Sequence, residues 1–212
     1  MKTAVIGLGN IGSRLATNLV NGGETLLIAD NTLDKAKQLA TKLGENAKPV
    51  EISTAVEQAD IIILAIWFDS IKDFFKQYEK ELAGKIIVDP SNPIAPNDKG
   101  GFTKTIPEDQ SSGELLLKIL PNGAKLVKAF GTLAAESLTT GTNRKPEKAV
   151  EFYASDDKNA AKEVQKLIIS NGFYPLYIGG IDQSIRIEVF GDLHEFGKIG
   201  KLVSIEEAKK FI

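Results

Sequence analysis

The residues that most constrain this chain lie at its start, where a glycine-rich turn separates an apolar strand from a helix. Residues 3–7 read Thr-Ala-Val-Ile-Gly, and Gly7, Gly9 and Gly12 form a Gly-x-Gly-x-x-Gly pattern. In such a turn the first glycine permits a tight exit from the strand. The second lets the backbone approach a pyrophosphate, and the third lets the helix pack closely on the strand. The pattern predicts the first crossover of a dinucleotide-binding fold.

The sequence on both sides of the motif supports this prediction. The helix that follows carries Ile11, Leu15 and Leu19 at spacings of four, as an amphipathic helix requires. Its N-terminus would direct free N–H groups and the positive end of its dipole toward phosphates. The next strand, residues 25–29, ends at Asp30, near the spacing expected of a carboxylate that accepts ribose hydroxyls. The alternative is a turn of an α/β protein that binds no nucleotide.

Composition narrows the function classes. The chain has 212 residues, with 26 Lys and Arg against 28 Asp and Glu, so no basic field indicates nucleic acid or an anionic membrane surface. Cysteine is absent and histidine occurs once, so no disulfide and no metal centre are expected. No apolar stretch approaches the length of a membrane span. We therefore expect a cytoplasmic protein with no nucleic-acid or membrane partner.

Strands and helices alternate along the chain. Continuous apolar runs at residues 60–66, 85–89 and 125–130 are typical of strands covered on both faces. Alternation of this kind predicts an α/β fold, a Rossmann doubly wound parallel sheet with a small C-terminal α/β extension. We expect residues 1–135 to form the dinucleotide-binding domain and residues 136–212 to form a small C-terminal portion packed on it.

Further elements are expected between and after these strands. Residues 90–107 hold four of the eight prolines and are interpreted as one long loop over the edge of the sheet, because functional loops of this length occur beside active sites. The helices and their caps follow from amphipathic spacing and capping residues. Helices are expected at 33–43, 53–58 with Ser53 as cap, 69–81, 111–120, 156–171 with Ser155 or Asp156 as cap, and from 182 onward; short strands are expected at 48–51, 149–154 and 174–178.

In an open parallel sheet, ligands bind beyond the carboxyl ends of the strands, at the point where the strand order reverses. This rule and the glycine motif together select the predicted cofactor-binding residues. They are Gly7, Leu8, Gly9, Asn10, Ile11, Gly12, Asp30, Asn31, Ala65, Ile66, Trp67, Ser70, Ser91, Asn92, Pro93, Lys128, Ala129 and Phe130. No catalytic residue is assigned.

Several of these residues have a second interpretation. Ser91 and Asn92, held between two prolines, would lie near a nicotinamide ring or form an ordinary turn. Trp67 would either line the cofactor pocket or cover the edge of the sheet as a core aromatic. Lys128 would reach the pocket or extend its charge to solvent. His194 is expected to be a surface or interface residue, because no matching acid–base motif surrounds it.

Two further motifs carry a family resemblance. Residues 89–93, Asp-Pro-Ser-Asn-Pro, and residues 128–132, Lys-Ala-Phe-Gly-Thr, occur together with the glycine motif. In this the chain resembles the NADP oxidoreductase family dependent on the deazaflavin coenzyme F420. The cytoplasmic reductase domains of six-transmembrane ferric reductases are similar as well. Residues 171–179 and 184–188 also fit, so the resemblance covers essentially the whole chain.

The resemblance implies hydride transfer between NADP(H) and a flavin or deazaflavin. Hydride then moves directly between two ring systems, so the protein mainly positions the rings and excludes water. No dedicated acid, base or nucleophile is required for that reaction. This agrees with the shortage of candidate residues in the sequence.

The sequence departs from the family pattern at three places. The second strand is followed by Asp30-Asn31 where the family commonly has Ser-Arg. A carboxylate about 4 Å from a phosphate is repelled by up to ~4 kcal/mol at an effective dielectric of about 20. NAD should therefore be preferred unless Asp30 turns away and Asn31, Thr32 or Lys35 takes the 2′-phosphate, and both cofactors stay open. Gly131 stands where the family often has Asn, which removes one polar contact. Trp67-Phe68 stands where the family often has Pro-Trp, and this difference concerns the deazaflavin pocket more than the nucleotide pocket.

Two other functions remain open. A dehydrogenase of a small metabolite needs a group that polarises a carbonyl or imine, and only Lys128, His194 and Arg186 are available. A dinucleotide-binding sensor would bind the cofactor without turnover. The final segment carries Leu193, Phe196, Ile199 and Leu202, which we expect to pack on the first domain and on the twofold partner of a homodimer.

Overall fold

The computed structural model describes residues 1–98 and 100–212. Its centre is a six-stranded sheet in the order β3-β2-β1-β4-β5-β8, and every neighbouring pair is parallel. The order reverses between β1 and β4, which is the switch point where a doubly wound sheet binds ligands. The predicted Rossmann fold is confirmed. The strands are β1 (Thr3–Ile6), β2 (Leu26–Ala29), β3 (Ala47–Pro49), β4 (Ile61–Leu64), β5 (Ile86–Asp89) and β8 (Lys125–Lys128).

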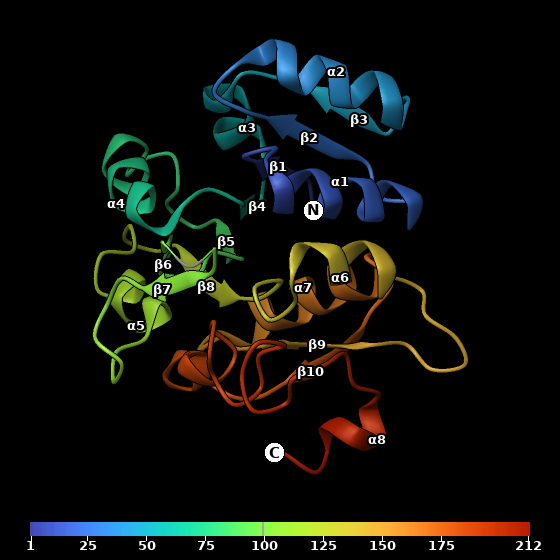
Figure 1. Cartoon of the computed structure of the whole chain (residues 1–212). Coiled ribbons are helices and arrows are strands. Elements are labelled where there is room, and N and C mark those ends of the chain that lie inside the picture. The colour runs from blue at the N-terminus through green and yellow to red at the C-terminus, as the bar shows by residue number, and fades with distance from the viewer. Residues whose placement is uncertain (99) are drawn as a thin grey trace.

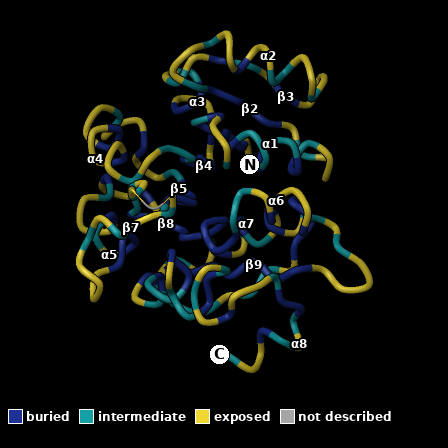
Figure 2. The backbone as a smooth tube through the Cα atoms, in the orientation of Figure 1, coloured by how far each residue is buried: buried dark blue, intermediate teal, exposed yellow. Residues whose placement is uncertain are grey.

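Helices cover both faces of this sheet (Figure 1). Successive strand side chains point to opposite faces, so β1 divides between two apolar clusters. Val5 packs with Leu15 and Leu19 of α1, whereas Ala4 and Ile6 pack with residues of α3 and α4. In Figure 2 the strand β2 is dark blue and the outer turns of α2 are yellow. The helices are α1 (Asn10–Asn21), α2 (Leu33–Leu43), α3 (Ile52–Gln58), α4 (Phe68–Gln77), α5 (Ser112–Leu117), α6 (Ala135–Thr140), α7 (Lys158–Ser170), the 3₁₀ helix η1 (Ile181–Arg186) and α8 (Ile205–Ala208).

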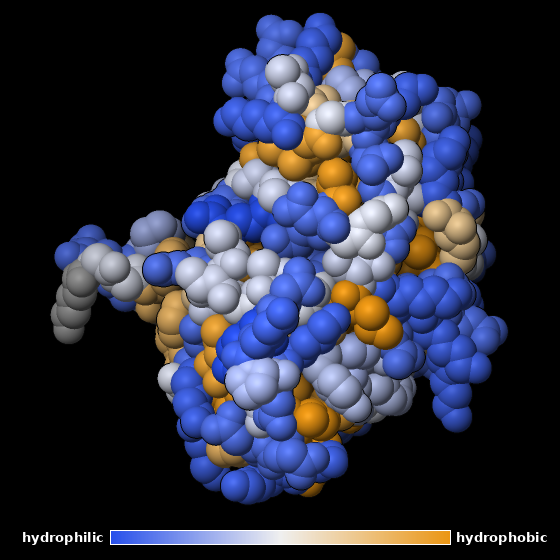
Figure 3. Space-filling model, turned by 90° about the vertical axis from the view of Figure 1, so that its right-hand side faces the viewer, coloured by the Kyte–Doolittle hydropathy of each residue, from blue (hydrophilic) through white to orange (hydrophobic). Residues whose placement is uncertain are grey.

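Residues 90–107 are not one irregular loop as predicted. They contain the antiparallel pair β6 (Ile94–Pro96) and β7 (Phe102–Lys104), which projects from the body of the molecule (Figure 3). Each strand is only three residues long, too short for an alternating pattern to stand out in the sequence.

Three details of the helices also differ from the sequence prediction. Asp157, not Ser155 or Asp156, caps α7, because its side chain accepts hydrogen bonds from the N–H groups of Asn159 and Ala160. Ser53 lies inside α3 rather than at its cap. The helical region expected from residue 182 is a 3₁₀ helix that begins at Ile181.

The C-terminal residues form a smaller layer joined to the first. β9 (Val150–Tyr153) and β10 (Tyr174–Tyr177) pair in parallel, and Ala154 continues toward the main sheet through an antiparallel bridge to Lys128. Part of this layer has its own apolar cluster around Phe152 and Leu193, while α7 packs into the cluster of α1. In Figure 1 the red C-terminal segment lies at the end of the molecule opposite α2. None of the helices in the described residues has the length and apolarity needed to cross a membrane.

Candidate functional site

The glycine-rich turn between β1 and α1 is packed against β4 on one side and open on the other. Gly7 has a φ of +89°, and a Cβ there would lie 2.4 Å from the carbonyl oxygen of Ala65. A Cβ at Gly12 would lie 1.8 Å from the carbonyl oxygen of Gly7. Gly9 differs, because a Cβ there would meet no atom within 4 Å. Two glycines therefore allow close packing, and the third leaves bare backbone facing open space.

The N-terminus of α1 begins at this open glycine. Gly9 is the N-cap residue, no side chain caps the helix, and its first turn contains no acidic residue. An uncapped helix of 12 residues presents N–H groups and the positive end of its dipole, which suit a phosphate group. The backbone here therefore fits the pyrophosphate of a dinucleotide.

Two hollows meet at the glycine turn. One, of about 470 Å³, runs toward the end of β2, and we call it the β2 hollow. The other, of about 460 Å³, runs toward β5, β8 and the C-terminal segment, and we call it the aromatic hollow because Trp67, Phe68, Phe102, Phe130 and Phe196 line it. Gly9, Ala65, Ile66 and Trp67 line both, so a single elongated ligand can span them.

Most of the predicted cofactor-binding residues lie on these walls. The β2 hollow also includes Gly7, Asp30, Asn31 and Ser70, and the aromatic hollow includes Asn10, Ile11, Ser91, Asn92 and Phe130. Five predicted residues line neither hollow: Leu8, Gly12, Pro93, Lys128 and Ala129. Trp67 is 64% exposed, which does not agree with the alternative of a core aromatic.

Asp30 at the end of β2 is held in place by the turn itself. One carboxylate oxygen accepts a hydrogen bond from the backbone N–H of Leu8 at 2.6 Å and pairs with the ammonium of Lys35 at 3.0 Å. Burial alone would raise the pKa of Asp30, but the Leu8 N–H and the Lys35 charge outweigh it and lower the pKa below its ordinary value. Asp30 is therefore a fixed anion on the wall of the β2 hollow.

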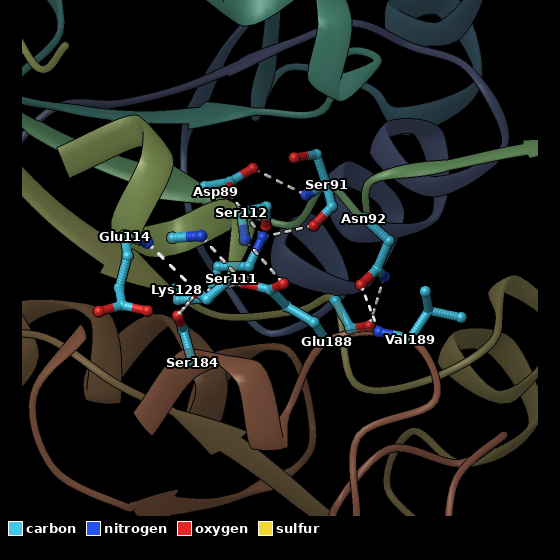
Figure 4. A network of polar contacts seen from close by, with 12 residues as sticks. Asp89, Ser91, Asn92, Ser111, Ser112, Glu114, Lys128, Ser184, Glu188 and Val189 are labelled. Atoms are coloured by element: carbon cyan, nitrogen blue, oxygen red, sulfur yellow. Dashed lines mark hydrogen bonds and ion pairs between the residues drawn. The ribbon is translucent and has the colours of Figure 1, made fainter. Parts of the chain in front are cut away.

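The loop after β5 is anchored by side chains (Figure 4). The carboxylate of Asp89 accepts the N–H of Ser91 at 2.8 Å. Asn92 donates to the carbonyl of Gly131 at 2.8 Å and accepts the N–H of Val189 at 2.7 Å, so it joins the loop to β8 and to the C-terminal segment. The buried hydroxyl of Ser91 has no hydrogen-bond partner in the protein. These bonds fix the loop to its neighbours, while the Ser91 hydroxyl stays buried without a protein partner.

Lys128 adopts neither of its two predicted roles. Its side chain is 2% exposed, and its ammonium pairs with Asp89 at 2.6 Å and donates to the carbonyl of Ser91. Glu188 lies close enough for the positive charge of Lys128 to act on it. Burial raises the pKa of Glu188, but Lys128 and the N–H groups of Ser112 and Gly113 together lower it below its ordinary value. Lys128 therefore lies outside the two hollows and holds the loop after β5 through Asp89 and Ser91.

The sequence predicted a surface or interface residue at His194, but the structure buries its side chain within the chain. It is 2% exposed and lines the aromatic hollow. Burial lowers the pKa of His194 to about 4, so the ring is neutral at physiological pH. Nδ1 accepts the N–H of Phe196 at 2.9 Å, and the backbone of Gly131 partly offsets the effect of burial on the pKa. Arg186 is likewise occupied, by Asp192 at 2.9 Å and by the carbonyl of Phe211.

The sequence analysis missed Glu151, which lies behind the aromatic hollow on β9. It is fully buried and accepts hydrogen bonds from the N–H of Phe130 at 2.9 Å and the hydroxyl of Thr132 at 3.2 Å. Burial raises the pKa of Glu151 to about 8. It supports a turn in which Phe130 has a φ of +64°. A lone carboxylate within the apolar strand predicted at 149–154 was the available signal. In the described part of the chain, no cluster of His, Cys, Asp or Glu could hold a metal ion.

Known proteins similar to this chain include NADP-dependent reductases. Residues 2–93 match the family described as "NADP oxidoreductase coenzyme F420-dependent". An F420-dependent NADP reductase of Methanocaldococcus jannaschii is 27% identical over 205 residues, which cover 91% of this chain and 90% of that protein. Metalloreductase STEAP3 of Rattus norvegicus is 26% identical over 187 residues, covering 88% of this chain but only 36% of that protein.

Two solved structures resemble the chain over most of its length. A hypothetical protein from Sinorhizobium meliloti is 32% identical, with a TM-score of 0.78, and the match covers 92% of this chain and 93% of that one. A putative F420-dependent NADP reductase from an Arthrobacter species is 23% identical, with a TM-score of 0.74 and 87% of each chain covered, which supports the fold alone.

The fold, the glycine turn and these similarities define the class: an NAD(P)-dependent oxidoreductase built on a Rossmann fold. Within that class the chain is a relative of the coenzyme F420-dependent NADP oxidoreductases, as the motifs in its sequence indicated.

Proposed function

We propose that the protein transfers hydride between a pyridine dinucleotide and a flat ring acceptor of the flavin or deazaflavin type. The dinucleotide would span both hollows, and the acceptor would occupy the rest of the aromatic hollow. The observation that carries this proposal is the lining of the aromatic hollow, which is mostly aromatic and aliphatic and includes Gly9 of the glycine turn. Flat rings stack favourably on such side chains.

The residues of the two hollows suit the parts of the cofactor. The bare backbone at Gly9 and the N-terminus of α1 would hold the pyrophosphate. Asp30 would accept hydrogen bonds from the adenosine ribose, and Ser91 and Asn92 would line the nicotinamide side. When bound, the reduced cofactor supplies a hydride, and the acceptor takes that hydride together with a proton from water. The protein holds the two rings in position and keeps bulk solvent away.

Reduction of a carbonyl or imine is less well supported, because it needs a group that delivers a proton to the reacting atom. The three candidates in the sequence all have other partners. Lys128 pairs with Asp89, Arg186 pairs with Asp192, and Nδ1 of the buried His194 accepts the N–H of Phe196. This favours an acceptor ring over a small metabolite.

The test is oxidation of NADH and NADPH in the presence of free flavins, deazaflavin coenzyme F420, ferric chelates, and simple carbonyl and imine compounds. We expect turnover with a flavin or with the deazaflavin. Turnover only with a carbonyl or imine would favour the metabolite dehydrogenase. Binding without turnover across the panel would favour the sensor. A Gly9→Val variant is the control, because its side chain would fill the open space beside α1 and block binding.

We further infer a homodimer in solution. Phe190 and Phe196 are 47% and 54% exposed on the C-terminal segment, and a twofold partner would cover such side chains. Light scattering should then give twice the mass of one chain, and a monomeric mass would contradict the proposal. The cytoplasmic location stays a prediction.

A further inference from the structure

The end of β2 carries a charge arrangement that hydride transfer itself does not need. The charged residues that the structure places on the wall of the β2 hollow are Asp30, Asp73 and Lys35. Their formal charges sum to −1, and the single cation, Lys35, is already paired with Asp30 at 3.0 Å. Arg14 on the neighbouring helix lines neither hollow and instead bonds the carbonyl of Asn10.

Asp30 cannot turn away from this hollow without a local penalty. Its side chain is 14% exposed, and it is the partner of the Leu8 N–H in the glycine turn. Moving the carboxylate would leave that N–H without its acceptor at the point where the backbone meets the pyrophosphate. The position of Asp30 and the shape of the phosphate-binding turn are therefore coupled.

The two forms of the cofactor differ at the adenosine ribose, which has a free 2′-hydroxyl in one and a 2′-phosphate in the other. A ribose diol brings two O–H donors, which match a fixed carboxylate. A 2′-phosphate brings between one and two negative charges and needs cationic or N–H donors. The β2 hollow offers a fixed carboxylate and one lysine that is already neutralised.

We infer that this chain prefers NAD(H) to NADP(H), with Asp30 as the residue that determines the preference. The inference rests on the proposed function, since it assumes that the β2 hollow holds the adenosine ribose. It sets this chain apart from relatives that are named for their use of NADP.

The first measurement is calorimetric titration of the protein with NADH and with NADPH at the same ionic strength. We expect NADH to bind at least tenfold more tightly, a difference of about 1.4 kcal/mol. Equal affinities, or tighter binding of NADPH, would overturn the inference while leaving the proposed function intact. Failure of both forms to bind would overturn the proposed function and this inference with it.

Substitutions separate Asp30 from the overall charge of the hollow. Asp30→Asn keeps an oxygen for the Leu8 N–H and removes the charge, so the affinity ratio should move toward NADPH by about tenfold. Asp73→Asn removes the same charge from the same hollow and is the matched control, whose ratio should change less than threefold. An equal shift in both variants would show that total charge, not Asp30, sets the preference.

The double variant Asp30→Ser with Asn31→Arg is the stronger form of the test. It replaces the carboxylate with a hydroxyl and adds a guanidinium that can bond a phosphate at two points. We expect the preference to invert. The melting temperature of each variant without cofactor shows whether the turn is intact, and an unchanged ratio in a folded double variant would overturn the inference.

Discussion

Trp67 is the only tryptophan in the chain, and it lies between the two hollows with 64% of its surface exposed. A reduced nicotinamide bound in the aromatic hollow would lie near it and accept its excitation energy. We expect Trp67 emission to fall when NADH or NADPH binds, and the oxidised cofactors to quench it less. Trp67→Phe should remove the emission altogether, which verifies the source of the signal. Constant emission at saturating cofactor would place the ring of the cofactor elsewhere.

Glu151 should make the folded state less stable as the pH rises. Burial raises its pKa to about 8 in the folded chain, against 4.5 for the free side chain. Between these values the folded state binds the proton and the unfolded state does not, so unfolding becomes easier with increasing pH. The slope contributed by this group is at most about 1.4 kcal/mol per pH unit.

His194 changes the free energy of unfolding in the opposite direction, and it does so at lower pH. Its pKa falls to about 4 in the folded chain from 6.5, so its stabilising contribution is lost as the pH falls below 6.5. The effects of Glu151 and His194 oppose each other between about pH 4.5 and 6.5. From pH 6.5 to 8 only the effect of Glu151 remains of the two. Urea denaturation should show falling stability over that range in the wild type and a flatter profile in Glu151→Gln. Parallel profiles would mean that Glu151 is ionised in the folded protein.

These residues also show why the sequence could predict a site but not the partners of each side chain. Asp89 was placed at the end of one predicted strand and Lys128 within another, yet only the register of β5 with β8 makes them directly opposite each other. His194 was assigned to a surface or an interface, because its place beside Gly131 in the aromatic hollow depends on how the C-terminal segment folds back. Contacts of this kind leave no local pattern.

At the scale of the element, the turn between β1 and α1 was predictable because its glycines act locally. The hairpin β6–β7 was missed because its strands are short and contain Pro96. The cap of α7 was misplaced by one residue, since three consecutive residues, Ser155, Asp156 and Asp157, can all cap a helix. Asp156 instead accepts the N–H of Ile181 and fixes the start of η1.

The same turn supports a matched pair of substitutions. Gly9→Ala introduces a Cβ into open space with an ordinary φ of −73°, so the melting temperature should hardly change while cofactor affinity falls at least tenfold. Gly12→Ala places a Cβ 1.8 Å from the Gly7 carbonyl oxygen, which should destabilise the fold by ~3 kcal/mol or more. Thermal unfolding and calorimetric titration separate the two effects. Equal loss of stability in both variants would contradict the division of roles.

At the scale of the whole molecule, the C-terminal portion contributes side chains to the aromatic hollow and also packs against the sheet. Val189, His194 and Phe196 line the aromatic hollow together with residues of the glycine turn. Glu188 accepts the N–H groups of Ser112 and Gly113 at the start of α5. The sequence predicted that this portion packs on the sheet, but the contribution of its side chains to the hollow required the tertiary structure.

The contacts across residue 135 predict cooperative unfolding. Leu15 of α1 and Leu167 of α7 share one apolar cluster, and Lys128 exchanges two backbone hydrogen bonds with Ala154 at 2.9 and 3.0 Å. The buried side chain of Asn18 bonds the carbonyl of Leu138 at 2.7 Å and the side chain of Asn171 at 3.1 Å. A segment of residues 1–135 alone would expose the apolar face of α1 and leave these polar groups without partners.

We therefore expect calorimetry to show a single unfolding transition whose calorimetric and van't Hoff enthalpies agree, even though the chain divides into two layers. Asn171→Ala removes the partner of Asn18 and leaves its buried amide incompletely bonded, so it should lower the one transition temperature without splitting the peak. A weak interface would behave differently, because the same substitution would then separate a C-terminal transition from that of the sheet. Two resolved transitions in the wild type, or a folded segment of residues 1–135, would show that the C-terminal portion is an independent domain.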